Sequence, residues 1–217
     1  MKLIASILIL LLHTSLAFAD TPPPTLLQIV GATQERARLS DSTLVIIDAQ
    51  REYVDGKLAL PGIGDTLAAA AKLLARARAA GTPVVHVVHR GGGALFDPHG
   101  AYFEIAAPLT PRAGESVVQK TLPNAFAGTN LADVLVKLGR KKLIVIGYMT
   151  HMCVSSTVRA ALDAGYKTTV VAGATATRDL PDGHGGTLPA AAVQAASLAA
   201  LADRFATVVQ GSEDVPD

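Results

Sequence analysis

Short apolar runs alternate with longer stretches rich in alanine and leucine along most of this chain, and the alternation constrains its fold more than any other feature. Continuous apolar runs are typical of strands that are buried on both faces, as in parallel sheets. Six such runs lie at residues 43–48, 83–89, 116–120, 143–146, 167–172 and 206–209. Stretches with helical spacing lie between them, at residues 63–80, 130–139, 154–165 and 189–203.

Strands that alternate with helices are joined by right-handed crossovers, which place helices on both faces of the sheet. We therefore predict an α/β fold, a three-layer sandwich with a mostly parallel six-stranded sheet covered by helices on both faces. In open sheets of this kind, ligands bind beyond the carboxyl ends of the strands. Polar side chains that follow the apolar runs are therefore the first candidates for a functional site.

Residues 1–19 have the pattern of a secretory signal peptide. Lys2 gives a positive start, an apolar stretch runs to Leu12, and Ala17 and Ala19 form a small-residue cleavage site. The apolar stretch is shorter than the roughly 20 residues of a spanning helix, and an uncleaved N-terminal anchor is the alternative. We predict an exported protein, periplasmic or secreted, with no membrane contact after signal cleavage.

The rest of the chain is expected to divide into a proline-rich linker with an N-terminal segment, residues 20–39, and one domain, residues 40–212. The whole chain has 19 basic and 18 acidic side chains, and one of the basic ones is Lys2 in the predicted signal. The mature protein is therefore balanced in charge, which argues against a nucleic-acid partner.

Cys153 is the only cysteine, and it follows the fourth apolar run at the start of a helical stretch. Backbone N–H groups and the helix dipole favour a thiolate at such a position, although a lone cysteine is more often a small buried apolar residue. Asp48 ends the first run and Lys120 ends the third. The three side chains are expected to meet at one edge of the sheet, where a thiol, a base and a cation suit nucleophilic catalysis.

Three motifs resemble those of the isochorismatase-like cysteine hydrolases. They are the first-strand motif LVIIDAQ at residues 44–50, the lysine segment KTLPNAFAGT at residues 120–129 and the nucleophile turn GYMTHMCV at residues 147–154. The resemblance runs from about Thr43 to Val209, and residues 40–212 are accordingly expected to form an isochorismatase-like hydrolase domain.

The resemblance implies roles for individual residues. Cys153 would be the nucleophile, Asp48 the general base and Lys120 the cation that lowers the thiol pKa. The family carries a cis peptide before the nucleophile turn, which falls here between Tyr148 and Met149. We take the backbone N–H groups of Met149 and Cys153 as candidates for the oxyanion hole.

Further side chains are candidates for contact with substrate. A site for a small molecule is mostly apolar with a few directed polar groups. The candidates are Gln50, Tyr53, His89, Phe96, Phe126 and His151. Packing in the core or at the surface is the alternative reading for each of them.

No metal and no cofactor is expected. The spacing of His86 and His89 points them to opposite faces of a strand, which makes a poor metal pair. Some related nicotinamidases bind zinc through an aspartate and histidines shortly after the first strand. Residues 51–58 contain no histidine, and this departure argues against a metal.

The reaction that the resemblance implies is hydrolysis of a C–N bond in a small amide, lactam or carbamoyl compound, through a cysteine thioester. Residues 122–126 and 150–153 are similar to streptothricin-type lactam hydrolases, and the family resemblance also implies a homo-oligomer. Two alternatives remain open. One is an isochorismatase-type vinyl ether hydrolase that uses Asp48 without covalent catalysis, and the other is a non-catalytic small-molecule-binding or thiol-sensing protein.

Overall fold

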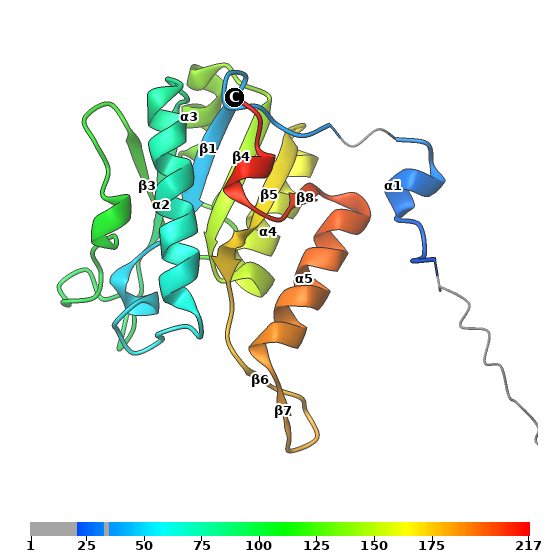
Figure 1. Cartoon of the computed structure of the whole chain (residues 1–217). Coiled ribbons are helices and arrows are strands. Elements are labelled where there is room, and N and C mark those ends of the chain that lie inside the picture. Colours follow the sequence, from blue (N-terminus) through cyan, green and yellow to red (C-terminus); the bar gives the residue numbers. More distant parts are fainter. Residues whose placement is uncertain (1–20, 33–34) are drawn as a thin grey trace, which may run out of the picture.

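The computed structural model describes residues 21–32 and 35–217, so the predicted signal peptide lies outside the described residues. A six-stranded sheet forms the centre of the molecule, with strand order β3-β2-β1-β4-β5-β8 and every neighbouring pair parallel (Figure 1). Its strands are β1 (Ser42–Ile47), β2 (Val84–His89), β3 (Ser116–Lys120), β4 (Lys142–Tyr148), β5 (Lys167–Ala176) and β8 (Thr207–Val209). The predicted α/β fold is confirmed.

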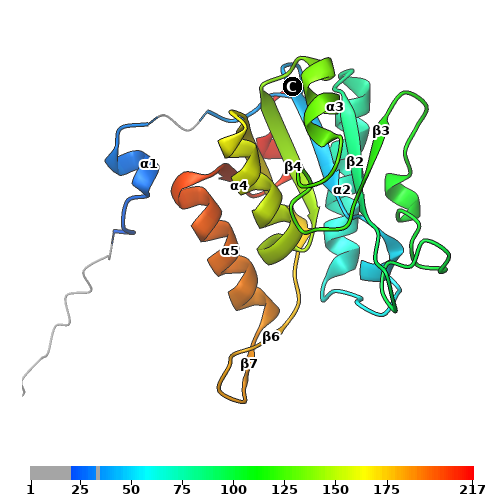
Figure 2. The ribbon, with the colours of Figure 1, turned by 180° about the vertical axis from the view of Figure 1, so that it is seen from behind.

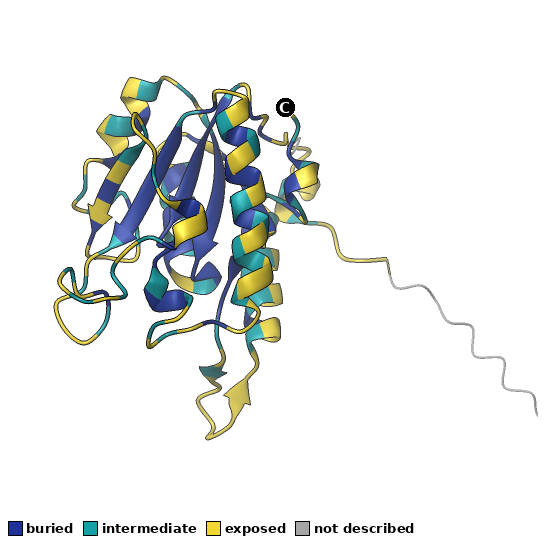
Figure 3. Ribbon diagram, turned by 60° about the vertical axis from the view of Figure 1, so that its left-hand side comes forward, coloured by how far each residue is buried: buried dark blue, intermediate teal, exposed yellow. Residues whose placement is uncertain are grey.

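Helices cover both faces of this sheet. Helix α2 (Ile63–Ala79) packs on one face, where Leu73 and Leu74 join the core. Helices α3 (Leu131–Leu138), α4 (Ser155–Asp163) and α5 (Ala190–Arg204) cover the other face, which Figure 2 shows from behind. The four central strands are buried almost throughout (Figure 3), which explains why they have continuous apolar runs, whereas the edge strands β3 and β8 are partly exposed.

Several short elements lie where the sequence predicted none, among them one helix and two strands. Helix α1 (Leu26–Ile29) is a single turn inside the predicted linker, and the side chains of Thr25 and Gln28 cap each other's backbone N–H groups there. Strands β6 (Leu180–Pro181) and β7 (Thr187–Leu188) form an antiparallel hairpin that projects from the body in Figure 1. None of the helices in the described part of the chain has the length and apolarity that a membrane crossing requires.

Close contact between β1 and β4 depends on Gly147. Its φ is +115°, and a Cβ at this position would overlap the carbonyl oxygen of Ile47 on the neighbouring strand. Only glycine adopts this conformation without cost and allows such an approach. The glycine therefore brings together the two strands that lead to Asp48 and Cys153.

Candidate active site

The three predicted catalytic side chains meet at the carboxyl edge of the sheet. The Lys120 ammonium lies 2.7 Å from Oδ2 of Asp48 and 3.4 Å from Sγ of Cys153. All three residues are buried, with at most 3% of their surface exposed. Side chains more than 30 residues apart in sequence thus form one cluster. The cluster agrees with the rule that ligands bind beyond the carboxyl ends of parallel strands, which we call the strand-end rule.

Local backbone geometry directs the base and the nucleophile. Asp48 follows β1 with φ +49°, a left-handed conformation that aspartate tolerates better than most residues. The peptide bond between Tyr148 and Met149 is cis, as the resemblance implied. After it, residues Thr150–Val154 form one wide π-helical turn before α4, and the Met149 carbonyl accepts the N–H groups of Met152 and Val154. Cys153 lies on this turn.

The electrostatics of the cluster correct one expectation. Burial raises the pKa of the Cys153 thiol to about 12, and the negative charge of Asp48 raises it further than Lys120 lowers it. Burial also raises the pKa of Asp48, against the opposing charge of Lys120. The resting sulfur is therefore a thiol and not the thiolate that the helix start and the lysine predicted. Desolvation is the largest cause because the sulfur is almost completely buried.

His89 joins the cluster through Lys120. The two residues are register partners on β2 and β3, and the lysine Nζ lies 2.9 Å from the histidine Nδ1. Burial and the nearby ammonium lower the pKa of His89 to about 4. The imidazole is therefore neutral at physiological pH.

A cavity of about 550 Å³ opens onto Cys153. Its wall is mostly apolar and includes the predicted residues Tyr53, His89 and Phe96. The Phe96 ring contacts the Tyr53 ring and the His89 ring, each at a centroid distance of 5.1 Å. Met149, the candidate for the oxyanion hole, lines it too. The remaining wall residues are Leu58, Gly91, Gly93, Ala94, Leu95, Pro123, Met152 and Arg178.

Arg178 is the functional candidate that the sequence reasoning missed. It is the one residue of this wall with a permanent positive charge, and it follows the carboxyl end of β5 by two positions. The predicted run ended at residue 172, six positions before Arg178, whereas β5 continues to Ala176, so the sequence pattern did not place Arg178 at a strand end.

Three predicted substrate contacts have other neighbours in the structure. The Gln50 amide is buried and bonds to the backbone N–H and carbonyl of His89 and to the carbonyl of Phe103, which leaves it no free group for a ligand. Phe126 packs against Tyr166 at a ring distance of 6.2 Å. The imidazole Nδ1 of His151 lies 2.5 Å from the Thr177 hydroxyl. None of the three lines the cavity at Cys153.

Asp48, His89 and Cys153 also form a group of potential metal ligands, because their ligand atoms lie within 4.8 Å of one another. The Lys120 ammonium contacts all three side chains. It supplies the positive charge that a metal ion would bring, and a second cation at this point would be repelled. The donor set therefore suits the lysine and does not suit a metal ion.

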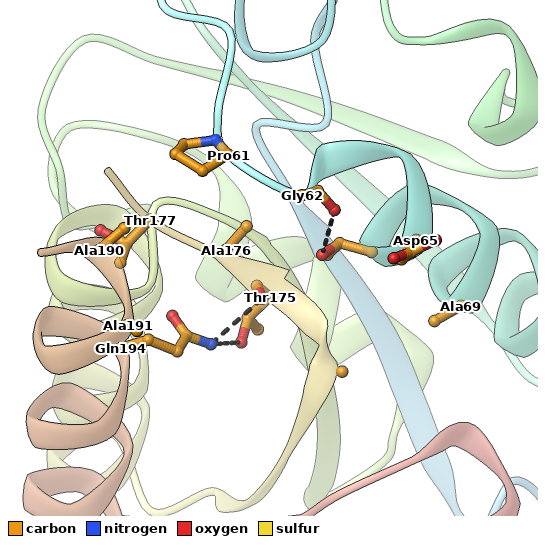
Figure 4. A pocket seen from close by; sticks show the side chains of 12 residues that line it. Pro61, Gly62, Asp65, Ala69, Thr175, Ala176, Thr177, Ala190, Ala191 and Gln194 are labelled. Atoms are coloured by element: carbon orange, nitrogen blue, oxygen red, sulfur yellow. Dashed lines mark hydrogen bonds between the residues drawn. The ribbon is translucent and has the colours of Figure 1, made fainter. Parts of the chain in front are cut away.

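A second cavity, of about 690 Å³, lies between the first turns of α2 and α5 (Figure 4). Its wall consists largely of small side chains, and the amide Nε2 of Gln194 donates to the carbonyl and hydroxyl oxygens of Thr175. None of Asp48, Lys120 and Cys153 lines it. The second cavity is larger than the first but lacks the reactive side chains.

Comparison with known proteins places these observations in a family. The isochorismatase domain model matches residues 42–213. A secreted isochorismatase effector of Verticillium dahliae is 41% identical over 85% of this chain and 96% of its own length. A streptothricin hydrolase of Streptomyces noursei is 39% identical over 76% of this chain and 67% of its own length.

Solved structures agree in fold. An isochorismatase from Pseudomonas putida KT2440 matches with a TM-score of 0.84 and 42% identity, over 89% of this chain and all of its own. An N-carbamoylsarcosine amidase from Thermoplasma acidophilum matches with a TM-score of 0.70 and 26% identity, over 82% of this chain and 99% of its own.

Proposed function

We propose, from the premise that this chain belongs to the isochorismatase family of hydrolases, that it cleaves a C–N bond of a small amide, lactam or carbamoyl compound through a cysteine thioester. The observation that carries the proposal is the Lys120 ammonium, which contacts both Asp48 and Cys153 at the edge of a cavity. The amidase and streptothricin hydrolase among the similar proteins support this substrate class.

Acylation begins from the neutral thiol. Asp48 takes the proton from Cys153, and the sulfur adds to the carbonyl carbon of the substrate. The N–H groups of Met149 and Cys153 are the proposed donors to the oxyanion that forms. When this intermediate collapses, the C–N bond breaks, the proton on Asp48 passes to the nitrogen, and the amine or ammonia leaves.

Deacylation reverses the proton transfers. Asp48 takes a proton from water, and the hydroxide adds to the thioester carbonyl. The C–S bond then breaks, the acid is released and the proton returns to sulfur. Throughout the cycle, Lys120 keeps its charge next to whichever of Asp48 and Cys153 is negative, which explains why the cluster can be buried.

The decisive experiment replaces the nucleophile. The variant Cys153→Ala should hydrolyse amides at least about 10⁴-fold more slowly than the wild type, because the thioester cannot form. Mass spectrometry of the wild type, quenched during turnover of an amide panel, should show an acyl adduct on Cys153. Retained activity in the variant would favour the alternative in which Asp48 acts without covalent catalysis. A bound but uncleaved amide without an adduct would favour a binding protein.

Export is part of the proposal. It rests on the signal-like pattern of residues 1–19 and on the secreted relative in Verticillium dahliae. N-terminal sequencing of the protein purified after expression should give a mature chain that begins at Asp20. A cytoplasmic protein that retains residues 1–19 would contradict it. Self-association, implied by the family resemblance, stays a prediction, as do the domain boundaries.

A further inference from the structure

His89 has a single side-chain hydrogen bond among residues 21–32 and 35–217, the one between its Nδ1 and the Nζ of Lys120, at 2.9 Å. The imidazole also lines the cavity at Cys153. The other ring nitrogen, Nε2, therefore has no hydrogen-bond partner within the described residues, and its natural partner is a molecule in the cavity.

Lys120 determines which nitrogen of His89 carries the proton. A lysine ammonium has three donors and no acceptor. Its three neighbours here are Oδ2 of Asp48, Sγ of Cys153 and Nδ1 of His89. Nδ1 must then accept the hydrogen bond, and in a neutral imidazole the remaining proton lies on Nε2.

The imidazole stays neutral because of its surroundings. Burial is the main cause that lowers the pKa of His89 to about 4, and the charge of Lys120 adds to it. The groups that face the ring or share its cavity are the ammonium of Lys120, the Phe96 ring, the thiol of Cys153, the carboxylate of Asp48 and Arg178. Protonation would place a second positive charge next to Lys120 and remove the acceptor on Nδ1.

The position of the ring is fixed as well as its proton. The side-chain amide of Gln50 bonds to the backbone N–H and carbonyl of His89, at 2.8 and 3.0 Å. The imidazole ring packs edge-on against the Phe96 ring, at a centroid distance of 5.1 Å. A donor held in this way loses little conformational entropy when a ligand binds.

We propose that the Nε2–H of His89, set by Lys120, donates a hydrogen bond to an acceptor oxygen of the substrate other than the scissile carbonyl. The inference rests on the proposed hydrolase function and narrows its substrate class. The favoured substrates carry a second oxygen close to the reacting carbonyl, as the carboxylate of an N-carbamoyl amino acid and the second carbonyl of a dicarbonyl amide do. A simple monoamide cannot make this hydrogen bond to the half-buried imidazole, so it binds more weakly.

Two variants separate the donor from the contact with Lys120. In His89→Asn, the side-chain oxygen can replace Nδ1 as acceptor, but no donor reaches the place of Nε2. In His89→Gln, the amide reaches that place and can donate. We expect the preference for N-carbamoylglycine over propionamide, measured as a ratio of kcat/KM, to fall about tenfold in His89→Asn. The ratio should recover substantially in His89→Gln.

Imidazole ¹⁵N NMR of the wild-type protein gives a readout that does not depend on turnover. The His89 signals, assigned by their loss in His89→Asn, should show the Nε2–H tautomer and no titration between pH 5.5 and 8. Addition of N-carbamoylglycine to the inactive variant Cys153→Ala should shift the Nε2–H signal more than propionamide does.

Several results would overturn the inference. They are an Nδ1–H tautomer, a titration near the ordinary histidine pKa, an Nε2–H signal that responds to neither amide, or an equal loss of rate on both amides in His89→Asn. Failure of the cysteine mechanism would be recognised separately, by retained activity in Cys153→Ala, and would leave the tautomer measurement intact.

Discussion

Strand β2 carries two histidines three residues apart, and the structure gives them opposite surroundings. His86 faces Glu115, whose carboxylate lies 2.8 Å from the imidazole Nε2 and is also bonded by Arg78. His89 faces the ammonium of Lys120 on the other side of the sheet. The first cluster, His86–Glu115–Arg78, ties β2, β3 and α2 together, and the second opens onto a cavity.

The two clusters satisfy their charges differently. Glu115 accepts well-aligned hydrogen bonds from Arg78 and from the backbone N–H of Arg112, so its negative charge is fully engaged. The oxygens of Asp48 are buried and accept no backbone N–H within the described residues, and their neighbours are the ammonium of Lys120 and the thiol of Cys153. A carboxylate that is incompletely bonded can still accept a proton. The comparison therefore teaches which cluster stabilises the fold and which one is available for chemistry.

Among the changes that compare the two clusters, the largest effect is expected from Asp48→Asn. Loss of the general base should reduce amide hydrolysis by about 10³-fold. The same change should make the thiol of Cys153 react faster with iodoacetamide, because the charge of Asp48 contributes to its raised pKa.

The variant Lys120→Met should slow the alkylation of Cys153, since the lysine is the group that lowers the pKa of the thiol. Alkylation rates followed by mass spectrometry from pH 7 to pH 10 test both directions, and slower alkylation of Asp48→Asn would refute this reading of the site.

A smaller effect, and on stability instead of activity, is expected from Glu115→Gln. Removal of one partner from a mostly buried ion pair leaves Arg78 without its counter-charge, which should lower the free energy of unfolding by about 2 kcal/mol. Urea unfolding at pH 7 measures this change. The value of kcat/KM on an amide substrate should stay within about twofold of the wild type, because the cluster lies away from Cys153.

The pH dependence of that difference has a defined sign. The hydrogen bond from Arg78 is the main cause that lowers the pKa of Glu115 from 4.5 to about 2 in the folded protein. A carboxylate with a lowered pKa stabilises the fold fully above pH 4.5, and this contribution is lost as the pH falls toward 2. The stability gap between the wild type and Glu115→Gln should shrink over this range, and a gap that widens would contradict the assignment.

The smallest effect is expected from Asp55→Asn, the matched control. Asp55 pairs with Arg51 at 2.5 Å, but the two side chains are 49% and 40% exposed. Solvent screens such a pair, so the midpoint of urea unfolding should not change measurably. A shift comparable with that of Glu115→Gln would show that burial does not explain the difference between the clusters.

Sequence reasoning succeeded where a property depends on chain order. The predicted run at residues 116–120 coincides with β3, and the strand-end rule brought Asp48, Lys120 and Cys153 together. Both results follow from the regular geometry of parallel sheets, which depends little on individual side chains.

It failed where a property depends on packing in three dimensions. The raised pKa of Cys153 results from burial and from the approach of a distant carboxylate, neither of which spacing reveals. Gln50 was expected in the cavity, but its amide is bonded to the backbone at the end of β2. The hairpin of β6 and β7 has strands of only two residues each, too short for any periodic pattern.

The contact of Gly147 with Ile47 has a consequence for protein engineering. Asp48 directly follows β1, and Cys153 follows β4. Because Gly147 has no Cβ, the two strands lie close together, and this affects how far a proton must travel between the two side chains. A search for better variants confined to the cavity wall would pass over this position. The separation between the base and the sulfur therefore depends on a position inside the sheet, Gly147, whose lack of a Cβ lets the two strands lie close together.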